Sequence, residues 1–84
     1  MINNNMEAVI IKEKIKEVLV SILEHENFDM RDELTAADVD GWDSLSHMMI
    51  LTKIEEKFNI KFKLRDLNKL KNMGTLVTVI QSKI

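Results

Sequence analysis

The sequence predicts an all-α fold, a small bundle of three main helices and one short helix. Proline is absent, glycine occurs only twice in 84 residues, and Lys, Glu, Leu, Ile and Met are plentiful, a composition that favours helices. Apolar residues recur at spacings of three and four in several segments, as in amphipathic helices. One run alternates like a strand, but the chain holds no second run to pair with it, and a lone strand is not stable.

A chain of this length has room for one hydrophobic core. We expect the asparagine-rich residues 1–5 to form a flexible N-terminus and residues 6–84 to form a single domain. The first helix should run from about Met6 to Glu24. Its apolar side recurs at helical spacing and consists of Ile11, Ile15, Val18, Leu19, Ile22 and Leu23.

The stretch from His25 to Trp42 keeps neither a helical nor a strand period. Loops longer than about 12–15 residues are usually functional or disordered. Four apolar residues are spaced along this stretch like anchors over a core: Phe28, Met30, Leu34 and Val39. We therefore predict an ordered loop, with a short helical turn around Thr35–Asp38.

The second helix should run from Ser44 to Phe58, with Asp43 as its N-cap. At 100° per residue its side chains form two stripes. The longer stripe, which we expect to face the core, is His47, Ile50, Leu51, Ile54 and Phe58. The other stripe is Leu45, Met48, Met49 and Thr52. A small core buries only one of them fully, so the second stripe should be partly exposed and available to a partner.

The alternating run, residues 58–64, is expected to be an extended connector that inserts Ile60 and Phe62 into the core. A short helix should follow at Arg65–Leu70, with Leu64, Leu67 and Leu70 on one side. Asn72 should cap a last helix through Ser82. The apolar repeat of that helix is Met73, Leu76, Val77, Ile80 and Ile84.

Composition and charge exclude several classes of function. Without cysteine there are neither disulfides nor thiolate metal sites. No apolar run approaches the roughly 20 residues of a membrane span, and residues 1–5 do not resemble a signal peptide. Eight acids and one base lie in residues 24–43, and eight bases and three acids lie in residues 44–84. Because the bases are scattered and few aromatic residues accompany them, we expect no nucleic-acid partner. We also expect no membrane partner, a monomer, and a cytoplasmic location.

The segment Gly41-Trp42-Asp43-Ser44-Leu45 is the strongest functional signal. Ser44 would stand at the start of a helix, where unpaired N–H groups and the helix dipole favour a phosphate. A capping role alone is the simpler interpretation, since serine is common at helix starts. Trp42 is expected to anchor the loop rather than to contact a substrate, with partner contact as its second role.

Neither histidine indicates catalysis or metal binding. His47, three residues after Ser44, invites a Ser–His pair, but esterases of that kind need an α/β sheet and a distant histidine, for which this chain has no room. We expect His47 to be half-buried in the core-facing stripe, near any space that a cargo enters. His25 lacks metal-ligand spacing and is expected to be a solvated helix end.

These features, in this order, resemble the acyl carrier protein family, including the related peptidyl and polyketide carrier domains. The resemblance rests on Gly41, the triplet Asp43-Ser44-Leu45, and the helix that ends Ile54-Glu55-Glu56-Lys57-Phe58. It extends over the connector, the short helix and the closing helix, and therefore over residues 6–84.

The resemblance implies a discrete, non-catalytic carrier. A phosphopantetheinyl transferase would attach 4′-phosphopantetheine to Ser44, with Asp43 as the motif's N-cap, and the arm's thiol would carry an acyl or aminoacyl thioester. Leu45, Met48, Met49 and Trp42 would contact the transferase and the acyl-loading and synthase enzymes. The pathway would be fatty-acid, polyketide or related synthesis. The cargo stays open, and the alternative is a helical interaction module that never receives the arm.

Two departures from the family's common pattern change the contacts through which we expect partners to dock. Many carriers are strongly acidic along the second helix, whereas here Met49 and Lys53 lie on its outward side and only Glu55 and Glu56 are acidic. Trp42 stands where many fatty-acid carriers have a smaller aliphatic residue. At this position the chain is similar to discrete polyketide or specialised-pathway carriers. We therefore expect partners to dock more through apolar contacts and the acidic loop.

Overall fold

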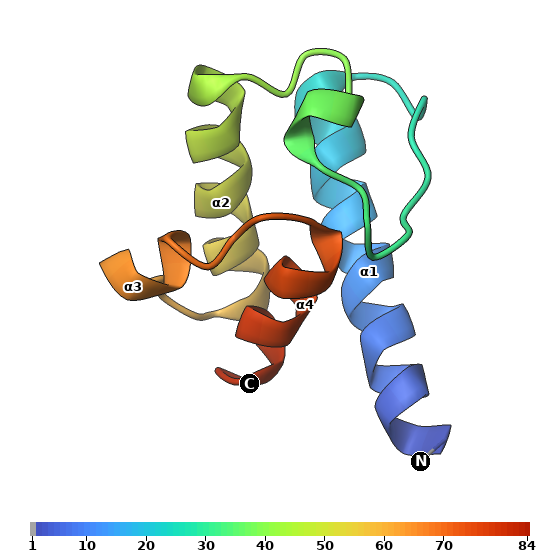
Figure 1. Cartoon of the computed structure of the whole chain (residues 1–84), viewed down its shortest axis with the longest axis vertical. Coiled ribbons are helices and arrows are strands. Elements are labelled where there is room, and N and C mark those ends of the chain that lie inside the picture. Colours follow the sequence, from blue (N-terminus) through green and yellow to red (C-terminus); the bar gives the residue numbers. More distant parts are fainter. Residues whose placement is uncertain (1) are drawn as a thin grey trace.

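The computed structural model describes the backbone of residues 2–84 and the side chains of residues 7–84 (Figure 1). Its helices are α1 (Ile2–Leu23), the 3₁₀ turn Ala36–Asp38, α2 (Ser44–Phe58), α3 (Leu64–Leu67) and α4 (Met73–Gln81). No strand occurs among these residues, so the predicted all-α class is confirmed. No helix in the described part of the chain is long and apolar enough to cross a membrane.

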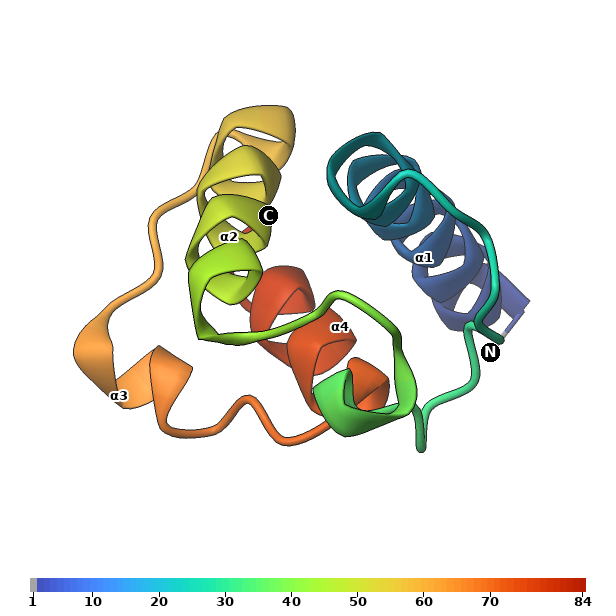
Figure 2. The same ribbon diagram turned by 90° about the horizontal axis from the view of Figure 1, so that it is seen from above.

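The core lies where α1, α2 and α4 meet (Figure 2). Its most deeply buried residues are Ile15 and Leu19 of α1, Ile50 and Ile54 of α2, and Ile80 of α4, each with no exposed surface. Burying one such side chain contributes roughly 1.5–3 kcal/mol. The predicted core stripe of α2 therefore faces inward, as expected.

Helix α1 begins at Ile2, earlier than the predicted start at about Met6. The apolar pattern marks only the part of a helix that packs, and α1 extends beyond that part: Val9 and Ile10 are about half-exposed, and the N-terminal end projects from the bundle (Figure 1). Met1, the first residue of the predicted flexible segment, lies outside the described residues, and the mobility of residues 1–5 stays a prediction.

The loop between α1 and α2 is ordered by the predicted anchors. Leu34 and Val39 are buried, and Phe28 and Met30 pack against the core. The predicted helical turn forms at Ala36–Asp38. The loop also caps α4, because the N–H groups of Met73 and Gly74 donate to the carbonyls of Leu34 and Asp32, at 2.8 and 2.9 Å.

His25 is not the solvated helix end that the sequence suggested. Its Nδ1 accepts from the backbone N–H of Asn27 at 3.0 Å, so Nε2 carries the proton and donates to the carbonyl of Asp40 at 2.7 Å. The ring also packs edge-on against Phe28. The histidine therefore ties the first residues of the loop to the residues just before Gly41.

The connector and α3 differ in part from the prediction. Ile60 is buried and Phe62 packs against the core, as expected. Helix α3 spans only Leu64–Leu67, shorter than Arg65–Leu70. Leu67 and Leu70 pack against the core, whereas Leu64 is 76% exposed, so the three leucines do not share one buried side.

Helix α4 follows its predicted cap. The Asn72 side chain accepts from the N–H of Thr75 at 2.9 Å, and four members of the predicted repeat are buried: Met73, Leu76, Val77 and Ile80. Ile84 is 57% exposed instead, because the helix ends at Gln81 and the period does not continue.

Candidate functional site

The start of α2 is fixed by its N-cap, Asp43. One carboxylate oxygen of Asp43 accepts from the N–H groups of Leu45 and Ser46, both at 3.0 Å. The hydrogen bond from the Ser46 backbone is the main cause that holds the pKa of Asp43 below its ordinary value of 3.8, with a smaller contribution from Leu45. The cap is therefore ionised at neutral pH, where a negative charge suits the positive end of the helix dipole.

Ser46 completes this cap, and the sequence analysis did not single it out. Its hydroxyl accepts from the N–H of Asp43 at 2.8 Å and donates to the carbonyl of Gly41 at 2.6 Å. Asp43 and Ser46 thus form a reciprocal capping box. The spacing of a capping residue and a second polar residue three positions later was the available signal.

Ser44 is the first residue of α2, between the two residues of the capping box, and its side chain is exposed. Figure 1 shows this end of α2 at the end of the loop, at the top of the molecule. Since Asp43 and Ser46 hold the backbone on either side, a rigid helix end presents the Ser44 hydroxyl to solvent. A phosphate on that hydroxyl would lie where helix N-termini favour anions.

Gly41 shapes the approach to the helix. Its φ is +86°, a left-handed conformation that glycine adopts without cost and other L-residues rarely adopt. The carbonyl of Gly41 receives the Ser46 hydroxyl. The turn at Gly41 therefore contributes directly to the capping box.

Next to Ser44, α2 exposes the predicted apolar stripe. Leu45, Met48 and Met49, which we call the outward patch, are 75%, 56% and 52% exposed. Exposed apolar residues that lie together in this way make the outward patch a candidate interaction surface. Methionine adapts its shape easily, which suits contacts with more than one partner.

Trp42 and His47 lie together between the loop and α2. The indole Nε1–H of Trp42 donates to Nδ1 of His47 at 3.0 Å. Both side chains are half-buried, and Trp42 packs against the core, as an anchor would. Because Nδ1 accepts this bond, the proton of the neutral ring is on Nε2, so neither nitrogen is free to take a proton from Ser44, which argues against the Ser–His pair. Both residues line a small cavity of about 50 Å³ between α2 and α4.

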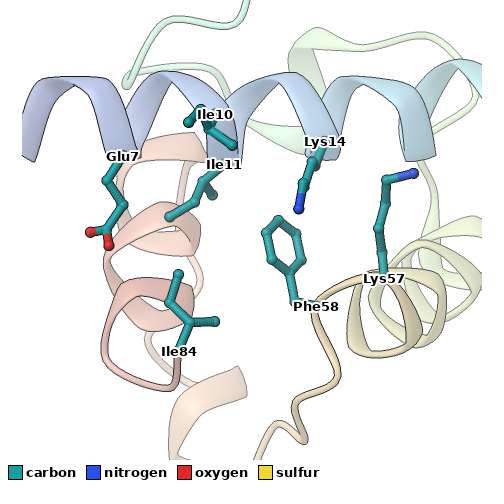
Figure 3. A pocket seen from close by; sticks show the side chains of 7 residues that line it. All are labelled: Glu7, Ile10, Ile11, Lys14, Lys57, Phe58 and Ile84. Carbon is teal, nitrogen blue, oxygen red and sulfur yellow. The ribbon is translucent and has the colours of Figure 1, made fainter.

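The wide groove of Figure 3 is a different feature. It has a volume of about 490 Å³ and lies at the opposite end of α2, beside Phe58, Ile11 and Ile84. Lys14 lies over the Phe58 ring there, 5.5 Å from its centroid. The helical rise puts Phe58 about 21 Å from Ser44, so this groove takes no part in the Ser44 site. The described residues contain no cluster of potential metal ligands.

A small helical bundle that presents one exposed serine at the start of its second long helix has the architecture of a carrier domain, to which a group is attached covalently. Residues 13–80 match a family model described as "Phosphopantetheine attachment site". The chain belongs to this family.

A solved structure supports the same assignment. The chain is similar to a holo acyl carrier protein from Geobacter metallireducens solved by NMR, with 33% sequence identity and a TM-score of 0.78 over 86% of this chain and 83% of that one. No curated protein sequence matches the chain. The fold is therefore that of acyl carrier proteins, as the sequence predicted.

The prosthetic group of this family is a covalently bound 4′-phosphopantetheine. The residues present fit that group, because the start of α2 offers an exposed hydroxyl at the positive end of a helix. Phosphopantetheine supplies a thiol, which the chain itself lacks because it has no cysteine. Proteins of this kind are carriers and do not catalyse reactions themselves.

Proposed function

We propose that Ser44 is the attachment site of phosphopantetheine, and that the chain carries acyl or aminoacyl groups as thioesters between enzymes of fatty-acid, polyketide or related synthesis. The exposure of Ser44 in the first turn of α2, next to the Asp43 cap, is the observation that supports this most directly. A separate phosphopantetheinyl transferase would modify it, and a monomer in the cytoplasm suits the role.

The chain's own residues would position the group rather than react with it. Asp43 and Ser46 hold the helix end, so Ser44 meets the transferase in a fixed orientation. The outward patch lies beside the attachment point, with Trp42 at the end of the loop as a second contact. Partners that bind there must form and release contacts repeatedly, and small interfaces serve that purpose.

The decisive test is intact mass after incubation with a promiscuous phosphopantetheinyl transferase and coenzyme A. We expect the chain to gain the mass of one phosphopantetheine group, and we expect Ser44→Ala to abolish the gain. Ser46→Ala is the matched control: it removes a neighbouring hydroxyl already engaged in hydrogen bonds and should still be modified.

Two outcomes would reject the assignment. An unmodified wild-type chain would favour the alternative, a helical interaction module without the arm. A mass gain that survives Ser44→Ala would move the attachment to another residue.

A further inference from the structure

The segment from residue 61 to residue 71, which comprises the end of the connector, α3 and the turn after it, displays only positive charge. Its five bases are all exposed: Lys61, Lys63, Arg65, Lys69 and Lys71. The one acid in the segment, Asp66, is 7% exposed and is neutralised by Lys83, whose Nζ lies 2.8 Å from its Oδ2. We call these five bases the basic edge.

The charges of the basic edge are available to a partner. Among the described side chains, none of its five bases forms an ion pair, whereas Lys12, Lys16, Lys57 and Lys83 each pair with a carboxylate. An unpaired base on a long side chain adapts readily to an anionic surface.

An apolar side chain stands in the middle of the basic edge. Leu64, between Lys63 and Arg65, is 76% exposed, slightly more than Leu45 of the outward patch. It starts the single turn of α3, and its neighbours Leu67 and Leu70 already pack on the core. Leu64 therefore adds little to the core and can be buried by a partner.

The basic edge lies on the outside of the molecule, away from the acids of residues 24–33, and the one acid of α2 beside it, Glu55, is engaged by the N–H of Phe62 at 2.8 Å. In Figures 1 and 2, α3 is at one side of the bundle and residues 24–33 run along the other side. The molecule measures 27 Å along this intermediate axis. Charges are largely screened beyond about 10 Å at 0.1 M salt, so a partner at the basic edge experiences its positive charge with little opposition from those acids.

We propose that the basic edge binds the surface of an anionic lipid bilayer, with Leu64 inserted at the headgroup level. Clusters of four to eight bases with apolar neighbours are typical of such peripheral contacts. The sequence predicted no membrane partner because it lacks a spanning segment, but a peripheral contact needs none. It would bring a carrier's cargo close to acceptors in the membrane.

Other polyanionic partners match the basic edge less well than an anionic bilayer does. Proteins hold a single-stranded nucleic acid with exposed aromatic residues as well as with Lys and Arg side chains. The one aromatic residue of the segment, Phe62, packs against the core. The acidic loop of a second copy would give head-to-tail contacts, which form a closed oligomer only when the rotation between copies closes a ring. An acidic protein would need an apolar pocket that matches Leu64, whereas a bilayer can bury a projecting leucine at any point on its surface.

The test is sedimentation of the unmodified full chain with vesicles at low salt. We expect binding to equimolar phosphatidylglycerol and phosphatidylcholine vesicles, and none to phosphatidylcholine alone. Each base near an anionic surface strengthens binding about fivefold, so the double variant Lys63→Glu/Arg65→Glu should weaken it by at least about 25-fold. Leu64→Ser should weaken it about fivefold.

The control is Arg31→Glu/Lys53→Glu, which changes the net charge equally at exposed sites away from the basic edge. Lys53 lines a groove with Glu17 and Val18 of α1. This variant should bind nearly as well as wild type. The proposal is overturned if it loses as much binding as the double variant, if Leu64→Ser changes nothing, or if single-stranded DNA or polyglutamate binds as tightly as the vesicles. Because the unmodified chain is used, the result is independent of attachment at Ser44.

Discussion

At the scale of single residues, the start of α2 separates the roles of two serines two positions apart. Ser46 donates to Gly41 and accepts from Asp43, so its hydroxyl is engaged in the helix cap. Ser44 occupies the first helical position, N1, and is not one of the two residues of the capping box. Its side chain is exposed. The capping box therefore fixes the backbone at the helix start, and the Ser44 hydroxyl stays exposed, as the proposed attachment requires.

Gly41→Ala should destabilise the fold through this network. A non-glycine residue at φ +86° carries a cost of roughly 1–2 kcal/mol, while the added Cβ would meet Leu23 at an ordinary 3.5 Å. We expect urea denaturation to show a loss of about 1 kcal/mol, and a smaller loss for Gly41→Asn, since asparagine tolerates this region better. Equal losses for both variants would point to a steric cause instead.

Met49→Glu should impair docking without affecting the fold. Met49 is 52% exposed, so the substitution costs little stability, but it places a charge in the apolar outward patch. We expect the kcat/KM of phosphopantetheine transfer to fall about tenfold, equivalent to about 1.4 kcal/mol.

Thr78→Glu, an exposed site on α4, adds the same charge away from the outward patch and should leave the transfer rate unchanged. The apolar docking hypothesis fails if Met49→Glu has no effect and the transfer rate instead falls steeply with salt.

At the scale of elements, prediction succeeded where two local signals coincide. Helices α2 and α4 each combine a capping residue, Asp43 or Asn72, with a regular apolar stripe. Helix α3 has a single turn, so its period cannot determine which leucines are buried. The contact of His25 with Asp40 joins residues 15 positions apart, and no local pattern reports a contact of that range.

Asp66→Asn should release α3 from the end of the chain in a pH-dependent way. The hydrogen bond from Lys83 is the main cause that lowers the pKa of Asp66 below 3.8, followed by the N–H of Lys63. Because the pKa of Asp66 is lower in the folded than in the unfolded chain, its carboxylate stabilises the fold at pH values above the unfolded-state pKa. That stabilisation is lost as the pH falls through the folded-state pKa.

Thermal unfolding at several pH values tests this. The melting temperature of Asp66→Asn should lie below that of wild type at neutral pH, and the difference should shrink once the pH falls below about 3.8. Asp29→Asn, in the exposed part of the loop, should melt near the wild-type temperature at neutral pH. A difference for Asp66→Asn that stays constant down to the lowest pH would show that the carboxylate charge is not involved.

At the scale of the whole molecule, the two ends of α2 serve different purposes. Its N-terminal end presents Ser44 and the outward patch, whereas its C-terminal end, with Phe58, joins the groove beside α1. The core between α1, α2 and α4 connects these ends rigidly. Helix α3 lies outside that core, attached by Leu67, Leu70 and the Asp66–Lys83 pair.

Hydrogen exchange should therefore divide the chain into two parts. Segments with few buried apolar contacts open at lower free energy than the core, and α3 has one turn of backbone hydrogen bonds, such as that from Leu67 to Lys63. We expect amides of α3 to exchange at least about tenfold faster than those of Leu19, Ile54 and Ile80. Asp66→Asn should accelerate α3 alone, because the core amides do not depend on its ion pair. Equal protection of α3 and the core would mean that the bundle opens only as a unit, and the basic edge would then be as rigid as the Ser44 site.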